Sequence, residues 1–248
     1  MPRGSALASY VLSPHSRAKL DDARLVSNQG NYIETAEGLV FAAALAYYSR
    51  IRFIENLLPL LREASSLRRV VNVLAGTKEG TIDTNNWATI RRGHVVSMMT
   101  LSLETFAKTA PEVSFIHSYP GFVKTNLIRG GEGALVATMG LVFSALEPFF
   151  TVPNEECGER HAFLATSARY PPGSDAHANA GVPLGNGVAA AKGTDGKFGS
   201  GVYSVDSQGE SAGPKTVALL AKLRQEGMPE AVLNHTQGEF SRATKAKK

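Results

Sequence analysis

Short apolar runs rich in β-branched residues alternate with helical stretches along most of this chain. The runs at 69–74 and 113–117, RVVNVL and VSFIH, are each followed by a turn that contains glycine. Residues 37–63 and 93–108 carry apolar side chains three or four positions apart, which predicts two long helices. Strands that alternate with helices of this length run parallel and are joined by right-handed crossovers, so we expect an α/β layer fold.

The remaining elements follow from the same patterns. A short strand is expected at Leu25–Ser27, before the turn Asn28–Gly30, and another at Val202–Val205. Pro59 should bend or end the first long helix near its last turns. The other expected segments are loops at 77–92 and 171–201, a helix or lid at 133–149, and helices at 155–167 and 215–225.

Composition is that of a soluble globular protein. The 248 residues are enough for one domain or two small ones, and 43% hydrophobic with 19% charged residues is ordinary. The single cysteine, Cys157, excludes an internal disulfide framework and a zinc site built from several cysteines. It suits a reducing compartment, so we expect a cytoplasmic protein. The longest apolar stretch, 134–152, contains Glu147 and Pro148, which argues against a membrane span.

The charge pattern does not favour a nucleic-acid partner. The net charge is +4, and four of the basic residues lie within 241–248, which we interpret as a solvated terminal tail. No basic stripe is interleaved with aromatic residues, so nucleic-acid binding is not expected.

Five motifs, in order, resemble those of the short-chain dehydrogenase/reductase family. They are the strand end LVSNQG at 25–30, the helix end NLLPLL at 56–61, the strand RVVNV at 69–73, the turn SYPGFVKT at 118–125 and the closing strand GSGVY at 199–203. The segments AYYSR at 46–50 and NEECGER at 154–160 are most similar to reductase-like proteins of filamentous fungi, some of which are associated with secondary-metabolite pathways.

The resemblance implies a Rossmann-like parallel sheet with flanking helices. It also implies hydride transfer between NAD or NADP and a carbonyl or alcohol. In this family a tyrosine is the acid/base, a lysine lowers its pKa, a serine holds the carbonyl oxygen and an asparagine supports a proton-relay water. A phenol with its ordinary pKa of about 10 is a poor base at neutral pH unless a nearby cation stabilises the phenolate.

The sequence departs from the family at these catalytic positions. The serine falls on Leu74-Ala75, the tyrosine and lysine on Thr89 and Gly93, and the asparagine on or beside Tyr47-Tyr48. We therefore assign no catalytic residue from sequence.

A second departure concerns the start of the family's fold. The family begins with a strand and a Gly-x-x-x-Gly-x-Gly turn that approaches the cofactor's phosphates, and nothing before Arg24 matches it. We expect a sheet that lacks this N-terminal βαβ glycine-rich unit. The expected organisation is a segment 1–23 without family match, a partial domain at 24–206, and a C-terminal helix and basic tail at 207–248.

Two explanations of that departure stay open. Either the chain is a truncated product, or a partner or second copy covers the surface that the missing unit would cover. The family often pairs helices like those at 37–63 and 93–108, which makes a homo-oligomer one expectation.

The resemblance to the family makes six residues candidates for contacts with the cofactor. Asn28 and Gly30 would line the cofactor groove. Pro120 and Gly121, with Val123 and Thr125, would lie against the nicotinamide. The alternative for both groups is a tight structural turn after a buried strand.

Other polar residues also have two interpretations. His94 and Arg91-Arg92, beside the tyrosine position, would supply a proton or bind an anion, or else lie in a solvated helix start. Tyr47 and Tyr48 are either phenols near the pocket or the packed face of a helix. We expect no metal site in the polar run 155–161, which has one histidine, and we interpret Cys157 as a small packed residue.

The sequence therefore favours an oxidoreductase that acts on a carbonyl or alcohol of a small organic metabolite, in a secondary-metabolite pathway. A catalytically inactive family member, including a truncated product, is the first alternative. A pocket protein without redox chemistry, such as an isomerase or cyclase, is the second. The choice between NAD and NADP stays open.

Overall fold

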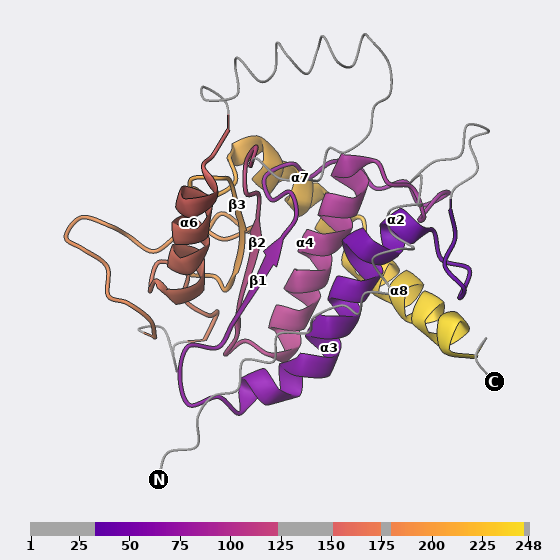
Figure 1. Ribbon diagram of the computed structural model, residues 1–248, viewed down its shortest axis with the longest axis horizontal. Helices are drawn as coiled ribbons and strands as arrows, with labels where there is room; N and C mark the ends of the chain where they lie inside the picture. The colour runs from indigo at the N-terminus through magenta and orange to yellow at the C-terminus, as the bar shows by residue number, and fades with distance from the viewer. Residues whose placement is uncertain (1–32, 124–150, 175–179, 246–248) are drawn as a thin grey trace.

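Three parallel strands with helices on both faces form the centre of the protein (Figure 1). The computed structural model describes residues 33–123, 151–174 and 180–245. The strands β1 (Arg69–Val73), β2 (Ser114–Ser118) and β3 (Val202–Val205) lie in the order β1-β2-β3. Val71, Ile116 and Tyr203 are aligned across the sheet. The predicted α/β fold with a Rossmann-like parallel sheet is confirmed.

The larger core lies on one face of this sheet. It is covered by α3 (Ser49–Arg62), α4 (Arg92–Thr109), α7 (Pro214–Gln225) and α8 (Met228–Lys245). Residues 94–103 of α4 are all buried, because this helix lies between the sheet and the outer helices. A smaller core on the other face lies under α6 (Asn154–Thr166), which packs against β1.

The helix predicted at 37–63 begins later than its pattern suggested. It starts with a short turn, α2 (Phe41–Ala43), passes through a π-helical stretch, η1 (Ala44–Tyr48), and continues as α3 to Arg62. Pro59 lies inside α3, and the helix ends three residues after it. The extra residue of the π turn places Tyr47 and Tyr48 side by side in the core, with their rings edge to face.

The C-terminal segment was predicted incompletely. We expected one helix and then a solvated tail from 241, but α8 continues to Lys245 and buries Val232, Thr236 and Phe240. These three residues are spaced by four, so one face of α8 packs on α4. The end of α8 is exposed as expected, but it is helical rather than an extended tail.

The other elements agree with the prediction to within one residue at each end. The loop at 171–201 has neither helix nor strand in its described parts. The predicted strand at 25–27 and the helix or lid at 133–149 lie outside the described residues.

Candidate functional site

The turns that follow the three strands gather at the carboxyl edge of the sheet. The turn after β1 crosses the ends of the other two strands at Gly76. A Cβ atom there would lie 2.2 Å from the carbonyl oxygen of His117 and 2.7 Å from that of Val205. The segments that end at Gly76 and Gly121 therefore lie side by side and point the same way, as predicted. This is the edge at which ligands bind in open parallel sheets.

The turn after β2 packs against the turn after β3. Gly121 has a φ of +82°, and a Cβ atom there would lie 3.0 Å from the Cβ of Ser207 and 3.1 Å from a methyl of Val152. Val123 forms a parallel bridge with Val152. Of the six predicted cofactor contacts, the structure thus brings Pro120, Gly121 and Val123 to this edge.

The other three predicted contacts, Asn28, Gly30 and Thr125, lie outside the described residues. Their place relative to the edge stays a prediction.

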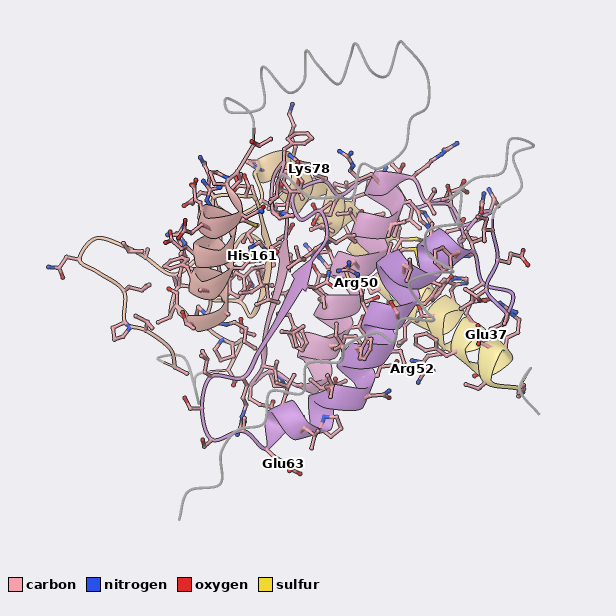
Figure 2. The ribbon with its side chains drawn as sticks, viewed as in Figure 1. Glu37, Arg50, Arg52, Glu63, Lys78 and His161 are labelled. Atoms are coloured by element: carbon pink, nitrogen blue, oxygen red, sulfur yellow. The ribbon has the colours of Figure 1, made fainter. Side chains whose placement is uncertain are left out.

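A small cavity opens beside this turn. Its volume is about 80 Å³, and Tyr119, Pro120, Arg160, His161 and Ser207 are among its lining residues. It has room for only a few water-sized groups. Figure 2 shows His161 on α6 and Lys78 on the loop after β1.

His161 lines this cavity, and one of its ring nitrogens is buried without a hydrogen-bond partner among the described residues. Its Nδ1 donates to the carbonyl oxygen of Cys157 at 2.7 Å, which leaves Nε2 as an acceptor. That Nε2 atom is buried and has no hydrogen-bond partner in the described part of the chain. The adjacent Arg160 donates to the carbonyl oxygen of Ser207 at 2.6 Å. Sequence reasoning placed His161 on a polar helix face, because nothing in the sequence brings the turn after β3 next to it.

A chain of buried polar side chains holds the loop after β1 on the sheet. The Thr100 hydroxyl donates to Glu79 Oε1 at 2.8 Å, and the Ser204 hydroxyl donates to the same oxygen at 2.6 Å. Thr100 Oγ1 also lies 2.8 Å from Nδ1 of His117. The backbone amide of Ala75 donates to Nε2 of His117 at 3.4 Å. Sequence reasoning missed this network, whose members come from two strands, a helix and a loop.

The protonation states of this network follow from burial. Burial lowers the pKa of His117 to about 3, so the ring is neutral at physiological pH. Since Nε2 accepts from Ala75, Nδ1 carries the proton and donates to Thr100. Burial also raises the pKa of Glu79, whose Oε2 has no hydrogen-bond partner among the described residues.

The positions of the family's tyrosine and lysine do not form a catalytic pair in this structure. Thr89 is buried and carries no phenol. At Gly93 a Cβ atom would lie 2.9 Å from the Cα of Gly80, because the loop after β1 packs directly on the start of α4. The Gly80 amide donates to the Gly93 carbonyl oxygen at 3.0 Å. The space that a lysine side chain needs at position 93 is therefore filled by backbone.

The interpretation of His94 as part of a solvated helix start is wrong. His94 is buried, accepts a hydrogen bond from the Asp83 amide on Nδ1 at 3.0 Å, and lies with Nε2 3.2 Å from the Trp87 carbonyl oxygen. Burial lowers its pKa, so it is a neutral ring that fixes the loop before α4. The neighbouring Arg91 and Arg92 are exposed, as expected.

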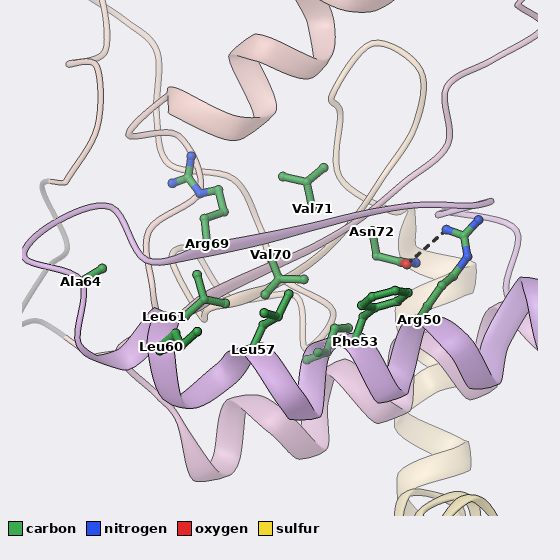
Figure 3. Close-up of a pocket in the computed structure, with 11 residues that line it drawn as sticks. Arg50, Phe53, Leu57, Leu60, Leu61, Ala64, Arg69, Val70, Val71 and Asn72 are labelled. Carbon is green, nitrogen blue, oxygen red and sulfur yellow. Dashed lines mark hydrogen bonds between the residues drawn. The ribbon is translucent and has the colours of Figure 1, made fainter. Parts of the chain in front are cut away.

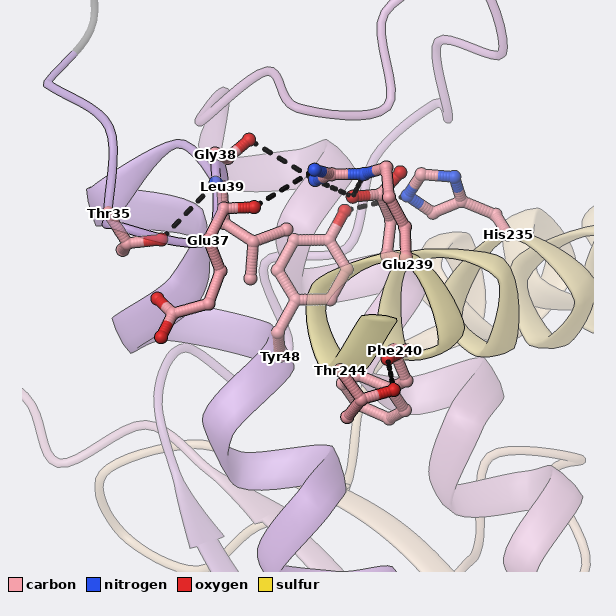
Figure 4. A network of polar contacts seen from close by, with 10 residues as sticks. Thr35, Glu37, Gly38, Leu39, Tyr48, His235, Glu239, Phe240 and Thr244 are labelled. Carbon is pink, nitrogen blue, oxygen red and sulfur yellow. Dashed lines mark hydrogen bonds and ion pairs between the residues drawn. The ribbon is translucent and has the colours of Figure 1, made fainter. Parts of the chain in front are cut away.

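Tyr47 and Tyr48 form the packed face of a helix, one of the two interpretations given above. The Tyr47 hydroxyl lies 2.8 Å from Ser102 Oγ and 2.7 Å from Thr236 Oγ1, and burial raises its pKa to about 12. The Tyr48 hydroxyl lies 2.6 Å from Nε2 of His235. Figure 4 shows this pair, with Tyr48 at the end of η1 and His235 on α8. Burial raises the pKa of Tyr48 as well, so neither phenol is set up as a base.

No group of three or more histidine, cysteine, aspartate or glutamate side chains in the described ranges is placed to hold a metal ion. No helix in those ranges is both long and apolar enough to cross a bilayer.

Sequence comparison relates the chain to fungal oxidoreductases. It is 42% identical over 223 residues to "Oxidoreductase AN1596" of Emericella nidulans, with 86% of this chain and 65% of that protein aligned. It is 35% identical to the "NmrA-like family domain-containing oxidoreductase notO" of an Aspergillus species, over 86% of this chain and 61% of that protein. It is 30% identical to "Short-chain dehydrogenase/reductase SAT2" of Stachybotrys chartarum, over 84% and 60%.

These matches cover only part of each relative. The chain spans less than two thirds of their lengths, and no family model matches it. The resemblance that the motifs predicted is confirmed at the level of sequence: the chain is similar to fungal proteins named as oxidoreductases, one of which is named a short-chain dehydrogenase/reductase.

Proposed function

We propose that this protein is an oxidoreductase-type nicotinamide-binding protein that acts on a carbonyl or alcohol of a small organic metabolite, in a secondary-metabolite pathway. The observation that carries the proposal is the Pro120-Gly121 turn, which lies at the carboxyl edge of a parallel sheet beside a cavity lined by His161, whose Nε2 has no hydrogen-bond partner in the described ranges. The relatives named as oxidoreductases support it.

In this proposal the nicotinamide end of such a cofactor lies at this edge of the sheet, and the cavity of about 80 Å³ takes only a small part of it, such as its amide group. Pro120 and His161 both line the cavity, and the buried Nε2 of His161 would accept a hydrogen bond from an amide N–H or a hydroxyl of a bound group that displaced the atoms now covering it. The nicotinamide, when bound, would give or take the hydride. His161 and the turn would orient the ring or the substrate, and α6 would cover the cavity from water.

The phosphate end has less support in the described residues. Gly181, Gly185 and Gly187 repeat the spacing of the family's phosphate-binding turn, but no helix follows them in the loop that ends at β3. Without a helix start, their amides lack the aligned dipoles that make such a turn an anion site. We therefore propose no phosphate contact there.

The experiment is a titration of the purified protein with NADPH and with NADH, followed by cofactor fluorescence. We expect saturable binding that Gly121→Val weakens at least about tenfold, because a side chain at that φ strains the turn and meets Ser207. The matched control is Gly158→Ala on α6, where a Cβ atom meets nothing within 4 Å. Absence of saturable binding up to millimolar cofactor refutes the proposal.

A second candidate function is cofactor binding without turnover. The filled lysine position at Gly93 and the threonine at 89 favour it, because the phenol and ammonium pair is replaced there. A panel of aldehydes and ketones with NADPH, followed by absorbance at the reduced nicotinamide band, separates the two. Binding without cofactor oxidation by any substrate supports the inactive family member. Conversion of a substrate without cofactor supports a non-redox pocket protein.

A further inference from the structure

Glu79 places a carboxyl group between the loop after β1, helix α4 and strand β3. Its Oε1 atom accepts two hydrogen bonds, from the Ser204 hydroxyl at 2.6 Å and from the Thr100 hydroxyl at 2.8 Å. Its Oε2 atom is buried and has no hydrogen-bond partner among the described residues. Since Oε1 already accepts from two neighbours, a proton of the carboxyl group itself lies on Oε2.

Within the described ranges no cation pairs with this carboxyl group. Lys78 belongs to the same loop (Figure 2), but its Nζ lies over the Tyr119 ring, 5.5 Å from the ring centroid. Arg50 of α3 donates instead to the side-chain oxygen of Asn72 at 3.3 Å (Figure 3). A negative charge on Glu79 would therefore stay uncompensated.

The other titratable groups that face Glu79 are neutral or negative. His117 of β2 is a neutral ring, because burial lowers its pKa to about 3. Burial raises the pKa of Glu79, and the negative charge of Glu104 on α4 raises it as well. The two hydroxyl donors and the residue's own backbone amide lower this pKa, but burial has the larger effect. The neutral acid leaves one O–H unpaired, which costs far less than a buried charge without a counter-ion.

The carboxyl group also holds a strained turn in place. Ser204, which donates to Glu79, accepts a hydrogen bond from the Thr77 amide at 2.7 Å. Thr77 has a φ of +68°, which a β-branched residue rarely adopts. On the other side of Glu79, the Gly80 amide donates to the Gly93 carbonyl oxygen at 3.0 Å. These contacts fasten the loop to β3 and α4 at the carboxyl edge of the sheet.

We propose that Glu79 is a positioning residue that is held as a neutral acid and closes the loop after β1 on the carboxyl edge, so that the loop loosens when Glu79 loses its proton. The charge that forms needs water, and water reaches it when the loop lifts from α4 and β3. Lys78 of this loop lies over Tyr119, which lines the cavity beside Pro120. The effect of this closure on cofactor binding rests on the proposed function, whereas the closure itself is a property of the free protein.

A carbon-13 titration of the side-chain carboxyl groups in the free, full-length protein measures the protonation directly. We expect the Glu79 Cδ resonance, which is assigned as the signal lost in Glu79→Gln, to titrate above the ordinary pKa of 4.5. Titration at or below 4.5 overturns the proposal.

Amide exchange measures the closure of the loop. The protection of the Thr77 amide, corrected for the intrinsic effect of pH on exchange, should fall at least about tenfold as the pH rises through the Glu79 titration. Glu79→Gln keeps an oxygen that accepts from the two hydroxyls and carries no charge, so this loss should be absent from that variant. Glu230→Gln on α8, where the carboxyl group is exposed, is the matched control and should behave as the parent chain does.

Other results of the exchange experiment contradict the proposal. Equal loss of protection in the parent chain and in Glu79→Gln, or constant protection in both, means that the carboxyl group does not control the loop. A Glu79→Gln variant that does not fold also overturns the proposal, because an amide replaces a neutral acid without a new charge.

The unfolding free energy gives a second measurement with a fixed sign. Between pH 4.5 and the raised native pKa of Glu79, the native protein holds a proton that the unfolded chain releases, so this group makes stability fall as the pH rises. The urea midpoint of Glu79→Gln minus that of the parent chain should therefore increase with pH. His117 acts in the opposite direction below pH 6.5, but both proteins contain it and the difference removes its contribution. A difference that does not change with pH overturns the proposal.

Cofactor titrations at several pH values separate this proposal from the proposed function. NADPH affinity should fall at the pH at which Thr77 loses protection, and Glu79→Gln should remove that step. The same step in both proteins would show that the loop does not act on the cofactor edge. Absence of NADPH binding at every pH refutes the proposed function, while the carbon-13 and exchange measurements still decide the role of Glu79.

Discussion

Single residues decide how closely the backbone segments of this protein approach one another. Gly80 and Gly93 bring the loop after β1 onto the start of α4 with no side chain between them. The same contact leaves no space for a lysine side chain at position 93. A small residue here is a requirement of packing, which the sequence position alone did not show.

Gly93→Ala should therefore destabilise the protein. Its Cβ atom would lie 2.9 Å from the Cα of Gly80, and relief of that overlap should cost about 1–3 kcal/mol of unfolding free energy. Urea denaturation measures it. Gly158→Ala is the control, since its Cβ atom meets nothing within 4 Å and alanine favours the helix by up to about 1 kcal/mol. Equal stability of the two variants would show that the close approach is not needed.

His117 should make stability fall on acidification. Burial lowers its pKa from 6.5 to about 3, so below pH 6.5 the unfolded chain binds a proton on this ring that the native protein does not bind. The contribution of the neutral His117 ring to the unfolding free energy is complete above pH 6.5. It is lost as the pH falls toward 3, by up to ~1.4 kcal/mol per pH unit. His117→Gln should flatten the curve of unfolding free energy against pH between 7 and 5. Parallel curves for the two proteins would contradict this.

At the scale of elements, the sequence pattern predicted the helices and strands that have a local hydrophobic repeat. It missed the helix whose packing depends on contacts with distant parts of the chain. The β-branched run of β1 and the three–four spacing of α4 are local, and both elements appear within one or two residues of their predicted bounds. The last residues of α8 were interpreted as a tail because four basic residues lie within 241–248, and the helix before them was missed although Val232, Thr236 and Phe240 carry a signal at spacing four.

The candidate site shows the same division. Pro120 and Gly121 were predicted from a local motif. Glu79, His117 and His161 were missed, because what surrounds them comes from segments between 17 and 125 residues away.

Tyr47→Phe should loosen α8 from α4. The hydroxyl of Tyr47 joins Ser102 on α4 to Thr236 on α8, and all three side chains are buried. Loss of these two hydrogen bonds should cost about 1–3 kcal/mol, measured by thermal or urea unfolding. The control is Tyr119→Phe, at the small cavity, where burial is only partial. A tyrosine-to-phenylalanine change that is harmless at 47 would mean that α8 is held by its apolar contacts alone.

At the scale of the whole molecule, the two faces of the sheet are secured differently. The larger core joins α3, α4, α7 and α8 through many apolar side chains. The smaller core under α6 has six buried members among the described residues, and polar contacts reinforce it. Chief among these contacts is Arg69 of β1, whose guanidinium donates to the carbonyl oxygens of Leu164, Ser167 and Tyr170 at 2.7–3.0 Å.

Arg69→Met should therefore release the α6 face before the rest of the molecule. The substitution leaves three carbonyl groups without their donor, at a cost of about 2–4 kcal/mol. Amide exchange in α6 should accelerate much more than in α4, whose apolar surroundings do not change. Arg68→Met is the matched control, because in the described part of the chain the Arg68 guanidinium donates to a single carbonyl oxygen, that of Ala64, at 2.8 Å. Since α6 carries His161 beside the cavity, the same variant should also weaken cofactor binding. If amide exchange accelerated equally in α6 and α4, the sheet and its two faces would open as one unit, and the prediction would be wrong.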